Sequence, residues 1–191
     1  MLTNLLSRVR RNHGLEHATI HMLSERHKNF NAQGNSDHLG FNLNVYGEIS
    51  ETEVATAVYE ALRRLRSGQH NLAVHPNCGT VLLTTATMAT LAAQAMITME
   101  QRRQNRSITD LSVLLNAMPS AIMAVTLSLL ISRPIGVQLQ AQYTVEGDPK
   151  GLEIIQVRRI NPSPVTRLFK LLLTGNRPDL RATAYRIETR G

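Results

Sequence analysis

Apolar and polar positions in the first part of the chain follow a helical pattern and then a strand-like one. From Leu2 to His27, apolar residues recur at roughly helical spacing with no proline, which predicts one or two helices. The polar segment 29–37 (NFNAQGNSD) is typical of a loop. From His38 to Tyr46, apolar residues alternate with polar ones, which predicts a half-buried strand.

A second helix is predicted just after this strand. Ser50 with Glu53 three residues later matches a capping box, and an apolar stripe at helical spacing follows as far as Gly68. A short strand is expected at 72–74. Helices and strands alternating in this way predict a small α/β domain over residues 1–79.

Two long uncharged segments change the character of the chain. Residues 80–99 and 111–132 contain no charged side chain, and each has about the 20 residues needed to cross a bilayer core. The short polar linker between them predicts a helical hairpin over 80–132, inserted in the cell membrane. The alternative is a buried hairpin in a soluble bundle, because the first segment carries six threonines and Gln94. We expect the α/β domain on the cytoplasmic side, although arginines flank both ends of the hairpin.

The remaining residues, 133–191, are predicted to be β-rich. Val137–Val145 and Leu152–Ile160 alternate around a Gly-Asp-Pro turn, which predicts a β-hairpin. A short helix is expected at Val165–Leu173 and a last strand at Ala182–Glu188. The predicted fold is therefore α+β: a small metallohydrolase-like α/β sandwich, interrupted by an apolar hairpin and followed by a β-hairpin.

Composition narrows the functional classes. The 191 residues are 42% hydrophobic, enough for a real core, and a single cysteine excludes an intrachain disulfide and fits a reducing compartment. The net charge is +7, but 4% aromatic residues and no tryptophan argue against a single-stranded nucleic-acid platform, so no nucleic-acid partner is expected. Binding of anionic lipid or nucleic acid remains an alternative, and would depend on Arg63, Arg64, Arg66, Arg102, Arg103 and Arg106.

The candidate chemistry centres on HGLEH at residues 13–17, an H-x-x-E-H motif. On a helix, His13 and His17 share one face, so both imidazoles could reach one metal ion. Glu16 lies beside that face and could act as base on a metal-bound water. This is the inverted zinc-binding motif of a class of metallohydrolases. The alternative is a cluster of histidines on a polar helix face.

Cys78 is the candidate third ligand. It precedes a predicted helix, whose N-terminus would favour the thiolate. His75 is a competing ligand, or a partner of one. Cys78 could instead be a small buried apolar residue.

These motifs together resemble S-ribosylhomocysteine lyase, the autoinducer-2 synthase. The matching pieces are HGLEH, the Gly-Phe strand with the following Glu- and Ala-rich helix (39–62), and Cys-Gly-Thr (78–80), within residues 12–80. The resemblance implies that His13, His17 and Cys78 bind Zn²⁺ or Fe²⁺, that Glu16 is an acid/base, and that the protein is a homodimer.

The chain departs from that family at Asp37. The family has a second, catalytic cysteine three residues before the Gly-Phe pair, and Asp37 stands at that place here. Asp37 could shuttle protons or ligate the metal, but we do not expect the lyase activity itself. The whole arrangement, hairpin included, also resembles an uncharacterised bacterial membrane family.

The sequence therefore predicts a membrane-anchored, metal-dependent hydrolase or lyase-like enzyme. Zn²⁺ or Fe²⁺ would be held by His13, His17 and Cys78, with Glu16 as general base and Asp37 as a further catalytic residue; peptidase activity is one version. The alternative is a non-catalytic membrane protein with a structural metal site, acting in an assembly. The expected partners are the lipid bilayer and a second copy of the chain.

Overall fold

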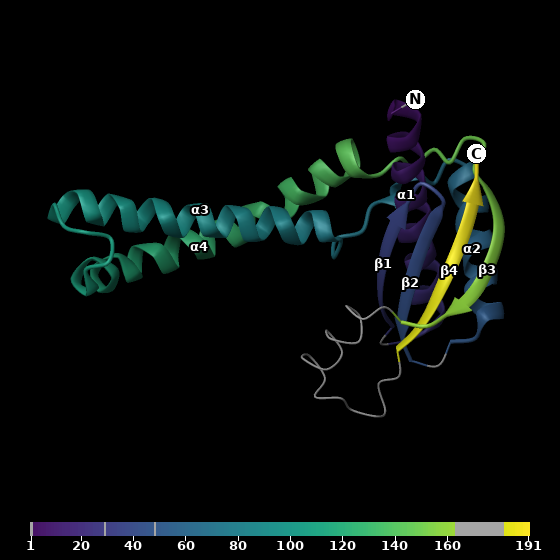
Figure 1. Ribbon diagram of the computed structural model, residues 1–191, viewed down its shortest axis with the longest axis horizontal. Coiled ribbons are helices and arrows are strands. Elements are labelled where there is room, and N and C mark those ends of the chain that lie inside the picture. The colour runs from purple at the N-terminus through teal and green to yellow at the C-terminus, as the bar shows by residue number, and fades with distance from the viewer. Residues whose placement is uncertain (1, 29, 48, 163–181) are drawn as a thin grey trace. The chain divides into compact units, whose positions relative to one another are not determined.

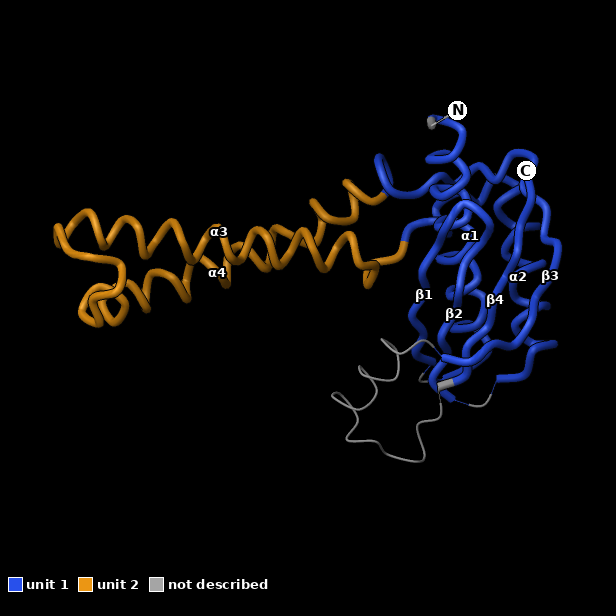
Figure 2. Tube along the Cα trace, viewed as in Figure 1, with its two compact units in different colours: residues 1–74, 141–191 blue, residues 75–140 orange. Residues whose placement is uncertain are grey.

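The computed structural model describes residues 2–28, 30–47, 49–162 and 182–191 (Figure 1). The chain forms two compact units: residues 1–74 with 141–191, and residues 75–140 (Figure 2). The first unit combines helices with a sheet, and the second is a helical hairpin. The predicted mixed α and β class is therefore confirmed.

Two helices of the first unit begin and end close to their predicted positions. α1 (Leu2–Arg26) is one continuous helix. α2 (Glu51–Arg66) starts at the predicted capping box. The Ser50 hydroxyl accepts from the Glu53 N–H at 3.2 Å, and the Glu53 carboxylate accepts from the Ser50 N–H at 2.9 Å. Both N-terminal donors are thereby satisfied, as helix capping requires.

The four strands form one antiparallel sheet. Its order is β1 (Asn31–Asp37), β2 (Gly40–Tyr46), β4 (Ala182–Arg190) and β3 (Glu153–Ile160). β4 pairs with both β2 and β3. The predicted strands at 38–46, 152–160 and 182–188 are confirmed, and the segment 133–191 supplies half of the sheet of the first unit rather than a sheet of its own.

Three local predictions were wrong. The segment 29–37 is not a loop, because β1 pairs with β2 along its whole length and backbone hydrogen bonds do not require apolar side chains. At 72–74 the structure has a 3₁₀ turn, η1 (His70–Ala73), in place of a strand. The segment 137–145 completes α4 and continues as a π-helical turn, η2 (Gln140–Thr144). β3 therefore pairs with β4 instead of forming a β-hairpin with 137–145, and the predicted helix at 165–173 lies outside the described residues.

The core of the first unit lies between the sheet and the two helices, which lie side by side on one face of the sheet (Figure 1). In β2, Phe41, Leu43 and Val45 are fully buried, while the residues that follow each of them are only partly buried. Leu15 and Leu23 bring α1 into the same cluster. Each such side chain contributes about 1.5–3 kcal/mol on burial. This packing fixes the rotation of α1, and so the direction in which the HGLEH side chains point.

The second unit confirms the predicted hairpin. α3 (Gly79–Gln104) and α4 (Leu111–Leu139) are joined by a short loop and pack against each other. Small residues allow this close approach: a Cβ added at Gly136 would lie 2.9 Å from the Val81 Cα. The Ser132 hydroxyl donates to the Thr85 hydroxyl at 3.1 Å. Such contacts are common between helices in membranes.

Both hairpin helices are long and apolar enough to cross a membrane. Their most apolar windows have mean hydropathies of 1.4 and 1.9, and only 6% and 11% of the residues in those windows are buried. The core helix of a soluble bundle would be mostly buried. The exposure of these apolar helices therefore favours a membrane-associated hairpin over the soluble alternative.

Candidate metal centre

The HGLEH motif lies near the middle of α1. His13 and His17 are one helical turn apart on the same face, and their ring centroids are 4.4 Å apart. His17 is 2% exposed, and His13 is partly exposed. The two imidazoles therefore form a pair at one place on the helix, as the spacing predicted.

Both rings are oriented by backbone carbonyls of other segments. Nδ1 of His17 donates to the Ala73 carbonyl at 2.7 Å, and Nδ1 of His13 donates to the Thr144 carbonyl at 2.9 Å. Because a carbonyl oxygen only accepts, Nδ1 must carry the proton in each ring. In the neutral imidazole the lone pair is then on Nε2, and this arrangement is typical of metal-binding histidines.

Cys78 follows a segment whose last residue, Val74, is hydrogen-bonded to α1. The Val74 carbonyl accepts from Nε2 of His21 at 3.0 Å. Cys78 follows four residues later, within about 14 Å of extended chain. There it is the N-cap of α3, and its N–H donates to the His75 carbonyl at 3.2 Å. The turn at 75–78 thus begins from a residue that is hydrogen-bonded to α1.

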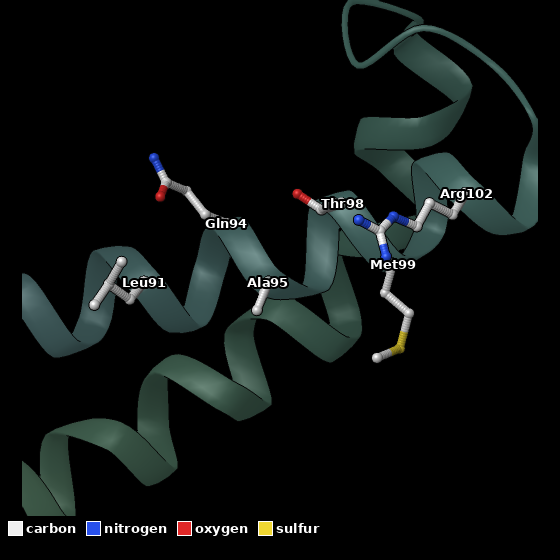
Figure 3. Close-up of a pocket in the computed structure, with 6 residues that line it drawn as sticks. All are labelled: Leu91, Gln94, Ala95, Thr98, Met99 and Arg102. Carbon is white, nitrogen blue, oxygen red and sulfur yellow. The ribbon is translucent and has the colours of Figure 1, made fainter.

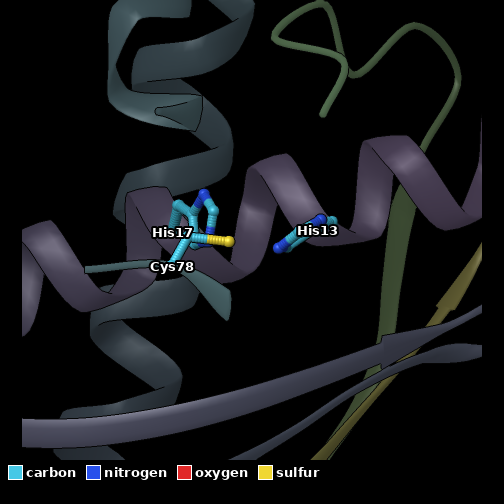
Figure 4. A group of neighbouring side chains, drawn as sticks. All are labelled: His13, His17 and Cys78. Carbon is cyan, nitrogen blue, oxygen red and sulfur yellow. The ribbon is translucent and has the colours of Figure 1, made fainter. Parts of the chain in front are cut away.

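The three predicted ligands come together. One side-chain N or S atom from each of His13, His17 and Cys78 lies within 4.8 Å of the others (Figure 4). A tetrahedral zinc site with bonds of about 2.0–2.3 Å places its nitrogen and sulfur ligands about 3.3–3.6 Å apart. The 4.8 Å within which the three atoms lie is wider than that spacing. His75 is not part of this group of three residues, and its Nδ1 accepts from the Asn77 N–H at 3.3 Å.

Glu16 points from α1 towards β1. Glu16 is 4% exposed, and its carboxylate accepts from the Ser36 hydroxyl at 2.6 Å. A Cβ added at Gly34 would lie 2.0 Å from Oε1 of Glu16. Gly34 therefore provides the space in which the carboxylate sits. Gly34 and Ser36 were not predicted from the sequence, in which the one available signal is a glycine within a polar segment.

Asp37 lies apart from the three candidate ligands, at the end of β1. Its carboxylate accepts from the Arg186 guanidinium at 2.8 and 3.0 Å and from the Leu39 N–H at 2.7 Å. Burial raises the pKa of Asp37, but the hydrogen bonds from Arg186 and Leu39 and the nearby positive charge outweigh it, so the pKa is lowered. This ion pair joins the β1–β2 turn to β4. The geometry gives Asp37 a positioning role, and its catalytic role stays a prediction.

The buried side-chain amide of Asn12, next to His13 in the sequence, also holds the β1–β2 turn in place. Nδ2 of Asn12 donates to the Asp37 carbonyl at 2.8 Å, and Oδ1 of Asn12 accepts from the Thr189 hydroxyl at 2.7 Å. Asn12 thus links α1 to the β1–β2 turn and to β4. Because a buried polar group is costly unless it is hydrogen-bonded, these bonds restrict how α1 can shift against the sheet.

A known protein family matches most of the residues described above. Residues 8–157 match the family described as Domain of unknown function (DUF6391). The chain belongs to this family. The match runs from α1 into β3, and so includes every candidate ligand of the DUF6391 chain.

One curated relative of the DUF6391 chain is similar over part of its length. It is Uncharacterized protein SYNPCC7002_A1392 of Picosynechococcus sp. (strain PCC 7002), 41% identical over 98 residues, which are 44% of this chain and 47% of the relative. The match thus spans about half of the relative. No solved structure matches the DUF6391 chain. Neither match names an activity, so the resemblance to S-ribosylhomocysteine lyase stays a prediction.

Most of the arginines singled out in the sequence have partners within the DUF6391 chain. Arg63 and Arg64 both pair with Glu60, at 2.7 and 2.8 Å. The Arg66 guanidinium donates to the Leu152 carbonyl at 2.8 Å. These interactions favour structural roles for the three arginines of α2 over a shared anion-binding surface.

An acid-stability measurement tests the role of Asp37. Because its pKa is lowered in the folded protein, ionised Asp37 adds stability above its unfolded pKa of about 3.9, and this contribution is lost as the pH falls through the folded pKa. Asp37→Asn should therefore be less stable than the wild type at pH 7 and nearly equal to it at pH 3. The side chain is 46% exposed, so the difference should stay below about 1 kcal/mol. Thermal unfolding at both pH values measures it, and a difference that does not change with pH would contradict this role.

Proposed function

We propose that the DUF6391 chain is a membrane-anchored, divalent-metal-dependent hydrolase or lyase-like enzyme. In this proposal His13, His17 and Cys78 hold Zn²⁺ or Fe²⁺, and Glu16 is the general base. The observation that carries the proposal is the convergence of one sulfur and two imidazoles, contributed by segments far apart in the sequence. Coincidence is a poor explanation, because the rings are also oriented as metal ligands are.

The donor atoms fit the proposed metals. Imidazole nitrogen and thiolate sulfur are common zinc ligands, and both also bind iron. Three protein ligands leave a fourth position for water or substrate, as in catalytic zinc sites. A metal held there would supply Lewis-acid chemistry and would make water a stronger nucleophile at neutral pH.

The surrounding residues support a hydrolytic role. Glu16 follows His13 by three residues on the same helix, and its carboxylate can accept a proton while the Ser36 hydroxyl holds one oxygen in place. His17 and Cys78 are buried, whereas His13 is partly exposed. Substrate would therefore approach from the side of His13. Hydrolysis of a peptide or another carbonyl compound is consistent with these residues.

The membrane anchor in this proposal is the α3–α4 hairpin. We place the sheet-containing unit on the cytoplasmic side, because a Cys78 thiol that serves as a ligand is best preserved in a reducing compartment. A homodimer is part of the proposal only through the resemblance to the dimeric lyase.

A second candidate function is a non-catalytic membrane protein with a structural metal. The environment of Glu16 favours it: the carboxylate is buried in the space left by Gly34 and bonded to Ser36, so it also connects α1 to β1. On this view the metal would hold Cys78 against α1, and Glu16 would have no role in turnover.

Metal analysis of the detergent-purified wild-type protein tests both versions. We expect close to one equivalent of zinc or iron per chain, measured by atomic emission spectrometry after removal of loosely bound metal. A wild-type protein that stays far below one equivalent after incubation with Zn²⁺ and with Fe²⁺ under reducing conditions would contradict the metal site itself. Turnover by Glu16→Gln separates the catalytic from the structural version.

A further inference from the structure

A shallow groove of about 420 Å³ runs along α3 near its C-terminal end. All of its lining residues belong to this helix, at spacings of three and one that keep them on one face. In Figure 3, Gln94 and Thr98 point to one side of the helix and the apolar side chains to the other, with the Arg102 side chain extending back along the groove. The lining residues are Leu91, Gln94, Ala95, Thr98, Met99 and Arg102.

The groove is charged at one end and has one apolar side, formed by Met99, Ala95 and Leu91, beside the polar Gln94 and Thr98. Arg102 is in the last turn of α3, next to the polar loop, and Leu91 is near the middle of the helix. The separation of eleven residues from Leu91 to Arg102 corresponds to about 16 Å of helix, close to half of the roughly 30 Å bilayer core. A molecule with an anionic head at Arg102 and one hydrocarbon chain along Met99, Ala95 and Leu91 would match the charged end and the apolar side of the groove.

Arg102 differs from the neighbouring arginines in its partners. Arg103 pairs with Glu100 and Arg106 with Asp110, each at 3.5 Å. The Arg102 guanidinium forms no ion pair with any side chain in the described part of the chain. At the boundary of a bilayer, such a charge is best compensated by a phosphate, which the planar guanidinium binds through two hydrogen bonds.

We propose that this groove binds one anionic phospholipid. The phosphate interacts with Arg102, the Thr98 hydroxyl lies one turn deeper where it can donate to an ester carbonyl, and one acyl chain covers Met99, Ala95 and Leu91. The inference rests on the proposed membrane anchoring by the α3–α4 hairpin, but it does not depend on the metal centre.

The test uses the full-length protein in vesicles of phosphatidylcholine and phosphatidylglycerol, followed by native mass spectrometry of the lipids that stay bound. Arg102→Gln is compared with Arg103→Gln, which removes the same charge one residue away. We expect the wild type and Arg103→Gln to retain one phosphatidylglycerol each, and Arg102→Gln to retain it about tenfold less. Ala95→Phe, which fills the apolar part of the groove, should lower retention without changing the charge.

Several outcomes would overturn the proposal. Equal losses in Arg102→Gln and Arg103→Gln would mean that only the general positive charge attracts anionic lipid. Equal retention of the two lipids by the wild type, or a second copy of the chain in place of the lipid, would also reject it. Alkaline extraction of membranes provides the separate check: a protein released by alkali rejects the membrane anchor, whereas one that stays integrated without lipid preference rejects the groove alone.

Discussion

Serine in place of Cys78 should leave the protein folded while reducing its metal affinity by at least about 100-fold, because losing a direct ligand should cost no less than losing a group that only orients one. A serine hydroxyl is a much weaker ligand than a thiolate. The fold should survive for a specific reason: Cys78 is the N-cap of α3 and makes no capping hydrogen bond through its side chain. Serine is a preferred N-cap residue, so the substitution should preserve or strengthen the start of that helix.

The metal-to-protein ratio of Cys78→Ser, with circular dichroism to confirm folding, measures this effect. His38→Ala is the matched control, because His38 is an exposed histidine in the β1–β2 turn and is not one of the three converging residues. His17→Ala should behave like Cys78→Ser. If folded Cys78→Ser keeps the wild-type metal content, the Cys78 sulfur is not a metal ligand. The two histidines alone would then be an incomplete site.

Glutamine in place of Glu16 should lower turnover by about 10²- to 10⁴-fold with little change in metal content, as expected when a general base is removed. The amide has nearly the same shape as the carboxylate, and its oxygen can still accept from the Ser36 hydroxyl. The connection between α1 and β1 is therefore kept while the proton acceptor is lost.

The measurement is metal-dependent hydrolysis of an activated ester, p-nitrophenyl acetate, by the wild type and Glu16→Gln. Ser36→Ala is a useful comparison, because it removes the hydrogen bond to Glu16 but leaves the carboxylate, and we expect a smaller loss of turnover. If Glu16→Gln turns over the ester as fast as the wild type, Glu16 is not the base and the structural-metal alternative is favoured.

The features that could be predicted from the sequence are those with a local signature. Ser50 and Glu53 identify the start of α2 because the capping box involves side chains three residues apart. The two histidines of HGLEH identify a shared helix face for the same reason. Cys78 could be predicted as their partner because the chain offers only one thiol.

The features that could not be predicted depend on contacts between distant backbone groups. The carbonyls of Ala73 and Thr144 orient the two histidines, but any residue type has a carbonyl, so nothing in the sequence marks them. β1 was predicted as a loop because its polar side chains lack a strand pattern, and only its pairing with β2 makes it a strand. Gly34 is needed because the carboxylate of Glu16 occupies the space beside it, and Glu16 belongs to another element.

The position of β4 has a consequence for how the protein is made. β4 lies between β2 and β3, yet it is synthesised after both of them. While the ribosome is still translating α3, α4 and β3, one side of β2 has no neighbour, and its backbone donors and acceptors are open to wrong partners. The sheet can close only after translation reaches β4, so nascent chains stalled before that point should need chaperone protection.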